Sequence, residues 1–563
     1  MSAPRLRLVA ASTVALLWYG LPSITEAAPT PPVTAFVGVT VVPADREQVL
    51  PGHTVVVKGG RITAVGPADR VKVPAGATRI EGAGKFLMPG IAEMHGHIPT
   101  RDPSGELSRR WFALFVANGV TTVRGMQGAP GQIALREQIA RGQILGPRLF
   151  LYGPPLGGDN VTTPASASTL VRTYKRAGFD GLKVTEGLLP PVFEALAKTA
   201  KAQKIPFGGH VSNAVGVERA LALGQKSIEH LDGYVEALLP SAAETSAIFG
   251  MAGGDLALID KADESKIAGL VAATKKAGAV ITPTMVAWRN LFGDADANAL
   301  AQLPELQYVP PRTREQWARG QAERAQTPVS PEQLRKLMAL RDRLLSAMAN
   351  AGGLVMLAAD APQRYNVPGF SLRHEMAAMV KAGLTPWQVV EAATTAPARY
   401  LGLERDFGTV AVGKRADLIL IDGNPLEDVA NIFRSSGVMA NGRWLPRAEL
   451  DALLAGIAAD LRFPSDKEVQ DFAIPAHTAA AMVGSYQGAE ADQTFRVLGK
   501  SGGLFGLWSA APDKMRRLRW QGSNVFLVPE DKATITAEIK DGTARVLMIK
   551  QDGAHVRWDR TIE

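Results

Sequence analysis

The sequence predicts an α/β protein whose largest part is a (β/α)8 barrel, the TIM barrel. One observation is a series of eight short apolar segments between Leu87 and Ala359, each of strand length. Another is that helical patterns such as Pro191–Gln203 and Ala214–Leu223 separate most of these segments. An open, doubly wound sheet is the alternative, but no G-x-G-x-x-G motif follows the first segment. Eight strand–helix units therefore favour the barrel.

The predicted barrel occupies residues 87–402. Its eight strands are Leu87–Met94, Val120–Arg124, Arg148–Tyr152, Gly181–Val184, Pro206–Gly209, Ser227–Glu229, Val280–Pro283 and Leu354–Ala359. Before the last strand, residues 287–344 are long for one crossover and mostly polar and helical. We therefore expect an insertion there that forms a lid at the mouth of the barrel.

Short β-type segments flank the predicted barrel on both sides. Before it, residues 28–86 are rich in Val, Gly and turn residues. After it, strands return within residues 403–446, where Asn441-Gly442 marks a tight turn. Residues 447–474 are expected to form a helical linker. Residues 475–563 are expected to form an all-β domain, because Gly-Gly and Asp-Gly turns separate its β-type runs.

Residues 1–27 have the pattern of a secretory signal peptide. Two arginines precede the apolar run Leu8–Leu21, and Ala27-Ala28 offers a cleavage site. An uncleaved membrane anchor is the alternative, but the run is short for a span of ~20 residues. We therefore expect an exported protein, periplasmic or secreted, with no stable membrane span once the signal is removed.

Composition narrows the chemistry and the partners. The chain has no cysteine, which excludes disulfides, thiolate nucleophiles and Cys–zinc sites. Any metal must therefore bind to histidine, carboxylate or modified lysine. The net charge of +8 is spread along the chain without a dense basic run, so we expect no nucleic-acid partner. A small-molecule substrate is expected, and assembly into a homo-oligomer stays open.

A pair of histidines follows the first predicted strand, in Glu93-Met94-His95-Gly96-His97. Residues two apart in a strand point to the same face, so His95 and His97 could bind one metal ion together. The chain has only eight histidines, which makes a pair at this spacing notable. Two histidines in a polar turn would be the simpler interpretation of the pair alone.

Four more residues that could bind metal close later predicted strands. They are Lys183 on the fourth strand, His210 after the fifth, His230 after the sixth and Asp360 after the eighth. The carboxyl ends of barrel strands meet at one face, where active sites lie. Each residue alone would more often be a structural group. Together with the histidine pair, they predict a metal site at that face.

These motifs make the chain resemble the amidohydrolase superfamily, most closely its imidazolonepropionase-like and prolidase-like (Xaa-Pro dipeptidase-type) members. The resemblance runs from about Val33 to Leu445 and includes Ser227-Ile228-Glu229-His230 and the tail Gly408–Leu418. It implies that the two β-rich flanks form one small β-sandwich. It also implies a metal-dependent hydrolase that cleaves a carbon–nitrogen bond of an amide or dipeptide-like substrate.

The resemblance further implies two Zn²⁺ ions per subunit. His95, His97 and Asp360 would bind one ion, and His210 and His230 the other. A CO₂-derived carboxylate on Lys183 would bridge them, since an ammonium cannot bind a cation. The two ions would lower the pKa of a bridging water, and Asp360 would take its proton and pass it to the leaving amine.

Several positions leave alternatives open. Arg124 and Tyr234 could bind a substrate carboxylate, although packing roles are equally consistent. Arg373-His374 reverses a usual His-Arg order, so we assign His374 no catalytic role. A mononuclear deaminase or cyclic-amide hydrolase is the catalytic alternative, but His210-Val211-Ser212-Asn213 lacks the Glu of a His-x-x-Glu motif. A non-catalytic binding protein is the alternative of another class.

Overall fold

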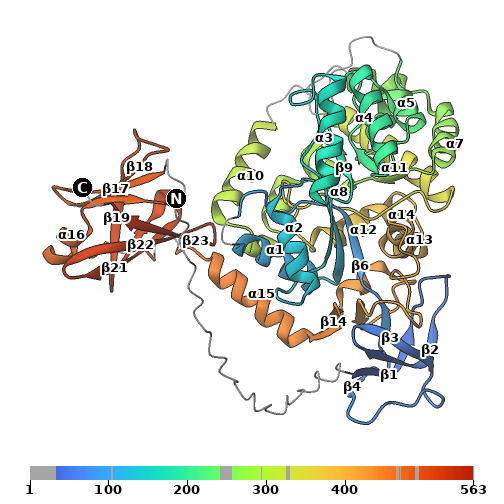
Figure 1. Cartoon of the computed structure of the whole chain (residues 1–563), viewed down its shortest axis with the longest axis horizontal. Coiled ribbons are helices and arrows are strands. Elements are labelled where there is room, and N and C mark those ends of the chain that lie inside the picture. The colour runs from blue at the N-terminus through green and yellow to red at the C-terminus, as the bar shows by residue number, and fades with distance from the viewer. Residues whose placement is uncertain are drawn as a thin grey trace, which may run out of the picture.

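The computed structural model describes residues 33–102, 105–240, 256–292, 295–324, 330–464, 468–469, 471–488 and 493–561. The predicted signal peptide, residues 1–27, lies outside these ranges. Figure 1 shows a large body of strands surrounded by helices, with a sheet of blue strands below it and a separate red barrel beside it.

The centre of the body contains two sheets of parallel strands. One sheet has the order β6-β7-β8 and the other β12-β11-β10-β9. Their bounds are β6 Ile91–Gly96, β7 Val120–Gly125, β8 Arg148–Leu151, β9 Leu182–Val184, β10 Phe207–Gly209, β11 Ser227–Glu229 and β12 Val280–Thr282. Every residue of these strands is buried except Arg148, Phe150 and Val280, as expected for parallel strands covered on both faces.

Backbone contacts continue the order of the strands beyond the two sheets. A parallel bridge between Tyr152 and Gly181 links β8 to β9, and another between Ile281 and Val355 links β12 to the eighth predicted strand. Residues 354–359 are not a regular strand, but the N–H of Met94 donates to the carbonyl of Leu357 at 3.0 Å. The predicted strands therefore lie beside their expected neighbours, with one correction. The first, Leu87–Met94, is divided, and its beginning belongs to β5 Phe86–Pro89, which pairs with strands of another sheet.

Helices cover the outside of these strands (Figure 1). They include α1 Glu106–Ala117, α2 Gly131–Ala140, α3 Pro164–Ala177, α4 Pro190–Gln203, α5 Val217–Ala222, α6 Tyr234–Leu238, α7 Ile267–Ala277, α12 Ser371–Lys381, α13 Pro386–Ala393 and α14 Thr395–Tyr400. Local sequence signals begin several of them. Thr163 and Ser166 form a capping box at α3, and Thr385 and Gln388 form one at α13.

The predicted lid, residues 287–344, is corrected in its second half. It contains α8 Met285–Phe292, α9 Ala297–Ala301, the 3-10 helix η4 Pro304–Tyr308, α10 Pro311–Arg324 and most of α11 Pro331–Asn350. Helix α11 presents Leu337, Leu344 and Met348 to the main apolar core. Most of its polar residues occupy the outer face of an amphipathic helix, which explains the polar composition of this segment, whereas Arg341 is buried.

The two β-rich flanks join in one sheet with the order β15-β14-β13-β5-β1-β2-β3, and β4 pairs with β1. Its strands are β1 Val33–Val41, β2 Leu50–Lys58, β3 Arg61–Pro67, β4 Thr78–Glu81, β5 Phe86–Pro89, β13 Leu418–Ile421, β14 Ser435–Ala440 and β15 Arg443–Pro446. The join is the antiparallel pair β5–β13, where Leu87 lies opposite Leu420. Sequence on both sides of the body thus builds a single unit with its own apolar core.

The C-terminal strands form a closed antiparallel barrel. They are β16 Gly484–Gln487, β17 Thr494–Lys500, β18 Gly503–Trp508, β19 Arg516–Gly522, β20 Val525–Val528, β21 Ala533–Lys540, β22 Thr543–Gln551 and β23 Ala554–Arg560. Helices α15 Arg447–Leu461 and α16 Ala476–Met482 precede it. Arg110 of α1 anchors this barrel to the body, because its guanidinium donates to the carbonyl of Gly553 at 2.7 Å.

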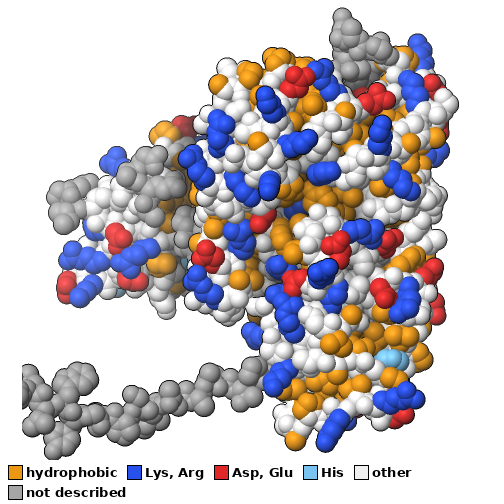
Figure 2. All heavy atoms as spheres, turned by 45° about the vertical axis from the view of Figure 1, so that its right-hand side comes forward, with side chains coloured by type: hydrophobic (Ala, Val, Ile, Leu, Met, Phe, Trp, Pro, Cys, Tyr) orange, Lys and Arg blue, Asp and Glu red, His pale blue; other side chains and the backbone are white. Residues whose placement is uncertain are grey.

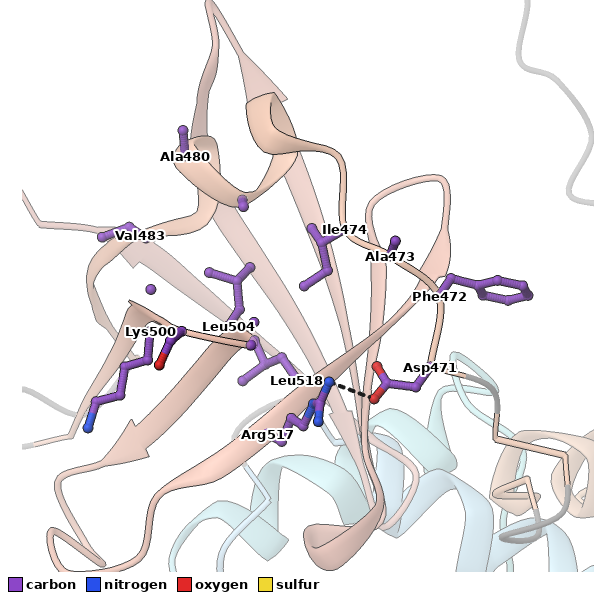
Figure 3. Close-up of a pocket in the computed structure, with 15 residues that line it drawn as sticks. Asp471, Phe472, Ala473, Ile474, Ala480, Val483, Lys500, Leu504, Arg517 and Leu518 are labelled. Carbon is purple, nitrogen blue, oxygen red and sulfur yellow. Dashed lines mark ion pairs between the residues drawn. The ribbon is translucent and has the colours of Figure 1, made fainter.

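A cavity of about 750 Å³ lies in this C-terminal region. Figure 3 shows Ile474, Leu504 and Leu518 along it and the ion pair between Arg517 and Asp471 at its edge. On the face drawn in Figure 2, Lys and Arg side chains are mixed with acidic and apolar ones. Within the described residues, no helix combines the length and apolar character needed to cross a membrane.

Candidate metal centre

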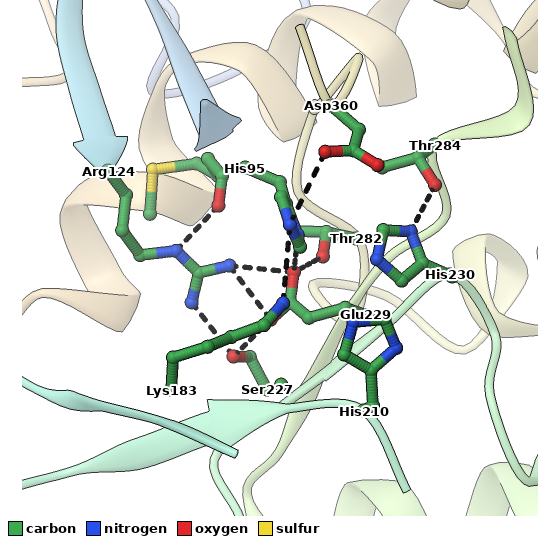
Figure 4. A network of polar contacts seen from close by, with 12 residues as sticks. His95, Arg124, Lys183, His210, Ser227, Glu229, His230, Thr282, Thr284 and Asp360 are labelled. Carbon is green, nitrogen blue, oxygen red and sulfur yellow. Dashed lines mark hydrogen bonds and ion pairs between the residues drawn. The ribbon is translucent and has the colours of Figure 1, made fainter. Parts of the chain in front are cut away.

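The structure brings the six predicted metal ligands into one cluster, and Figure 4 shows five of them: His95, Lys183, His210, His230 and Asp360. His97 Nε2 lies 2.7 Å from Asp360 Oδ1, and His95 Nε2 lies 3.6 Å from the same oxygen. Lys183 Nζ lies 3.3 Å from His95 Nε2. The ring of His230 lies between those of His95 and His210, with centroid distances of 4.6 and 4.8 Å.

Unusual backbone geometry places these side chains. His230 and Asp360 have positive φ angles of 61° and 58°, which non-glycine residues adopt rarely and mostly at functional sites. Before His210, Gly209 has a φ of 139°, and a Cβ there would lie 2.1 Å from the carbonyl oxygen of Val184. Only glycine allows β10 to approach β9 this closely, and that approach brings His210 beside the other ligands.

Each of the four histidines contacts a polar side chain through Nδ1. The contacts are His95 to Glu229 Oε2 at 2.7 Å, His97 to Gln127 Oε1 at 3.0 Å, His210 to Asp232 Oδ2 at 2.6 Å and His230 to Thr284 Oγ1 at 2.7 Å. Metal-binding histidines typically use one ring nitrogen for the metal and the other for such a partner, which fixes the ring. The arrangement therefore leaves Nε2 as the metal-binding atom of all four.

Arg124 lies beneath the cluster instead of facing substrate, which corrects the predicted binding role. Its side chain is fully buried and donates to both carboxylate oxygens of Glu229 at 3.0 Å and to the carbonyl of Met94. Burial alone would raise the pKa of Glu229, but Arg124 and Lys183 hold it below its usual value. Glu229 is therefore an anion that accepts the Nδ1–H of His95.

Tyr234 and His374 lie outside the cluster. The hydroxyl of Tyr234 contacts Thr274 Oγ1 at 2.6 Å inside the apolar core, so the predicted contact with a substrate carboxylate is wrong. His374 Nε2 contacts Glu305 Oε1 at 2.6 Å, which ties α12 to η4.

The protonation states suit metal binding. Burial lowers the pKa of His95, His210 and His230 well below 6.5, so these imidazoles are neutral, the form that binds cations. Burial also lowers the pKa of Lys183, which favours the uncharged amine. Only an uncharged amine can react with CO₂, so the carbamate that the resemblance implies is chemically accessible here.

Glu93 is a supporting residue whose role the sequence did not reveal. Its carboxyl group accepts the N–H of His95 at 2.9 Å and that of Ala359 at 3.1 Å, and so joins β6 to the segment that carries Asp360. Burial raises its pKa to about 8. The Nδ1 partners Gln127, Asp232 and Thr284 were also missed, because no fixed spacing links them to the histidines.

The donor set fits a divalent metal. Ligand atoms of His95, His230 and Asp360 all lie within 4.8 Å of one another, a grouping that could hold a metal ion. This grouping differs from the one that the resemblance implies, in which His230 joins His210. Imidazole nitrogen with carboxylate oxygen is the combination that zinc prefers when no cysteine is present.

The comparison with protein families agrees with this cluster. The Amidohydrolase family matches residues 86–445, which is more than half of the chain. The chain therefore belongs to the amidohydrolase family, and the resemblance seen in its motifs is confirmed.

Individual relatives are more distant. An adenine deaminase of Rubrobacter xylanophilus is 24% identical over 453 residues, which cover 78% of this chain and 62% of the deaminase. The chain thus spans about three fifths of that relative's length.

Among solved structures, a prolidase described as putative from Bifidobacterium longum has a TM-score of 0.55 at 23% identity, covering 76% of this chain and all of its own. Bottromycin amidohydrolase has a TM-score of 0.59 at 24% identity, covering 77% of this chain and 91% of its own. Both likenesses concern the fold.

Proposed function

We propose that this protein is a metal-dependent hydrolase that cleaves the carbon–nitrogen bond of an amide or dipeptide-like small molecule. One observation carries the proposal: four histidines, each fixed through Nδ1, lie in one cluster with Lys183 and Asp360 at the ends of parallel strands. Membership of the amidohydrolase family supports the reaction class. The prolidase fold supports a peptide-like substrate.

The proposed scaffold is a (β/α)8 barrel of residues 87–402. Its support is the order of the strands and the bridges that link β8 to β9 and β12 to Val355. The β-sandwich would combine residues 28–86 and 403–446, and residues 475–563 would be a separate domain. Export stays a proposal that rests on residues 1–27 alone.

The proposed site holds two zinc ions. His95, His97 and Asp360 would bind one, His210 and His230 the other, and carboxylated Lys183 would lie between them. When bound, such a pair of ions lowers the pKa of a water and polarises a carbonyl. Asp360 then accepts a proton at its carboxylate and returns it to the leaving nitrogen. Asp360 Oδ1 lies 2.7 Å from His97 Nε2, which places the carboxylate among the proposed ligands.

Deamination is the second candidate, and the likeness to adenine deaminase favours it. A single-metal deaminase needs an acid to protonate the ring, commonly a Glu three residues after the His of strand five. Here that position is Asn213, and Lys183 has no part in a single-metal site. Cleavage of an amide therefore remains the first proposal.

Metal analysis and substrate screening test the proposal together. Protein produced with zinc and bicarbonate should contain about two zinc ions per chain, and Lys183 should carry the added mass of CO₂. The same preparation should hydrolyse members of a dipeptide and N-acyl amino acid library and leave adenine unchanged. One zinc, an unmodified Lys183 and ammonia release from adenine would establish the deaminase instead. No turnover of any C–N substrate would favour a binding protein.

A further inference from the structure

Two carboxylates lie beside the histidine centre, on the Nδ1 side of His210. Glu186 follows β9 and Asp232 follows β11, so both flank the strand that precedes His210. Glu186 Oε1 lies 3.9 Å and Asp232 Oδ2 lies 2.6 Å from His210 Nδ1. Ligand atoms of these three residues all lie within 4.8 Å of one another. His210 also belongs to the histidine centre, whereas Glu186 and Asp232 do not.

Each of these carboxylates has an oxygen that lacks a partner. Glu186 Oε1 and Asp232 Oδ1 are buried, and neither accepts a hydrogen bond from the described residues. The side chain of Asp232 is 0% exposed. Among the described residues, no Lys or Arg forms an ion pair with either carboxylate, and the guanidinium of Arg341 donates to the carbonyl of Pro283. Buried carboxylates without a partner are costly unless a cation joins them.

We propose that Glu186 and Asp232 bind a divalent cation at a site separate from the histidine centre. Oxygen ligands of this kind suit a hard ion of the Mg²⁺, Mn²⁺ or Ca²⁺ class. The ammonium group of a substrate is another cation that these carboxylates could attract. It is as wide as a water molecule, and Glu186 Oε1 and Asp232 Oδ1 expose no surface that water can reach. A bare divalent ion is smaller than a water molecule. The side chain of Glu186, 20% exposed, gives the ion a route from solvent.

A proton is the rival occupant. Burial, together with the neighbouring Asp232 and Glu236, raises the pKa of Glu186 to about 8. If the carboxyl groups are held as acids, no metal is needed to neutralise them. Metal binding by the folded protein distinguishes the two, because a protonated pair would bind no ion at neutral pH.

The test uses the full chain, which is first loaded with zinc and then freed of excess metal. It is titrated with Mn²⁺, and electron paramagnetic resonance measures the Mn²⁺ that stays unbound. Zinc binds nitrogen-rich sites more tightly than Mn²⁺, so it should keep the histidine centre. We expect one Mn²⁺ to bind per chain. Glu186→Gln should weaken that binding by at least about tenfold, the range seen when partners of metal ligands are removed, with zinc content unchanged.

Glu194→Gln is the matched control. Glu194 lies on α4, is half exposed and pairs with Arg219, so its loss should leave Mn²⁺ binding unchanged. If Glu186→Gln does not fold, Glu186→Ala replaces it, because Asp232 also fixes the ring of His210 and its loss would disturb the zinc centre. The proposal is overturned if the wild type binds no Mn²⁺, if Glu186→Gln binds it equally well, or if Glu186→Gln loses zinc as well. Zinc content of the wild type tests the histidine centre separately, so the two proposals can fail independently.

Discussion

The parallel strands of the body and the antiparallel strands of the C-terminal barrel use polar residues differently. Strands β9, β10 and β11 are buried along their whole length, and the ligands His210 and His230 follow the carboxyl ends of β10 and β11. Strands such as β21 alternate between buried and exposed positions. Parallel strands covered on both faces can offer chemistry only where they end, whereas an antiparallel strand can face solvent along its side.

The cores of the two regions differ accordingly. The C-terminal barrel packs aromatic rings, with Phe495 and Trp508 at a centroid distance of 4.2 Å. Among the described residues, both groups that could bind a metal belong to the body. The comparison teaches that the C-terminal barrel is built to be stable and to contact the body, while the body carries the buried charge that chemistry needs. Substitutions in the two regions should therefore affect different properties of the protein.

Lys183→Ala should have the largest effect on activity, and its effect should be limited to the body. Removal of the bridge between the two metal positions should reduce hydrolysis to background, and short carboxylic acids should restore part of it by replacing the carbamate. The C-terminal barrel should keep its unfolding temperature. Steady-state kinetics with and without added formate or acetate measure the effect. Full activity in this variant would remove Lys183 from the mechanism.

Asp360→Asn should reduce turnover by about 10²–10⁴-fold, the usual contribution of an acid–base group. The amide keeps the shape of the carboxylate and an oxygen for the metal, but it cannot take a proton. Kinetics and metal content should be measured on one preparation. If metal is retained and turnover falls by less than about tenfold, Asp360 acts only as a ligand, and the proton must move through another group.

A pair of core substitutions sharpens the comparison of the two regions. Phe193 packs against Phe207 in the body, and Phe495 lies in the core of the C-terminal barrel. Each Phe→Ala change should cost about 3–5 kcal/mol. We expect Phe193→Ala to lower only the unfolding transition of the body in calorimetry, and Phe495→Ala only that of the C-terminal barrel. Equal shifts of one shared transition would show that the regions unfold together.

The smallest effect concerns pH. Glu375 accepts the N–H groups of Met285 and Val286 at the start of α8, and burial raises its pKa from 4.5 to about 7. Between these values the folded chain keeps a proton that the unfolded chain has lost, so stability falls as pH rises through this window. The loss is at most about 3 kcal/mol.

Glu375→Gln should make this fall shallower, because glutamine does not titrate. Urea unfolding at pH 5 and pH 8 measures the difference. Absolute stability should drop, since the amide NH₂ faces a backbone N–H that lost its acceptor. Glu218→Gln, an exposed position on α5, is the control and should leave the slope unchanged. An unchanged slope in Glu375→Gln would place the titrating group elsewhere.

Much of the candidate site could be predicted from the sequence. The sequence predicts that His95, His97, His210, His230 and Asp360 lie at strand ends. The prediction follows from the spacing of the first two and from the apolar runs before the others, because the local residue pattern indicates strand length and burial. The roles of Arg124 and Tyr234 could not be predicted in this way. Arg124 ends the second predicted strand and Tyr234 comes four residues after His230, so both positions are compatible with an active-site role. Only the packing of the structure shows that both side chains are buried with partners of their own.

The sequence by itself determined the family, the order of the strands and the residues that could bind metal, since these depend on local periodicity and residue type. Only the tertiary structure decided which partner fixes each histidine, that α11 belongs to the core, and that Glu186 lies next to Asp232. These facts depend on contacts between residues far apart in the chain. The spacing of residues in the sequence does not indicate such contacts, because they form only when the chain folds and the strand ends come together.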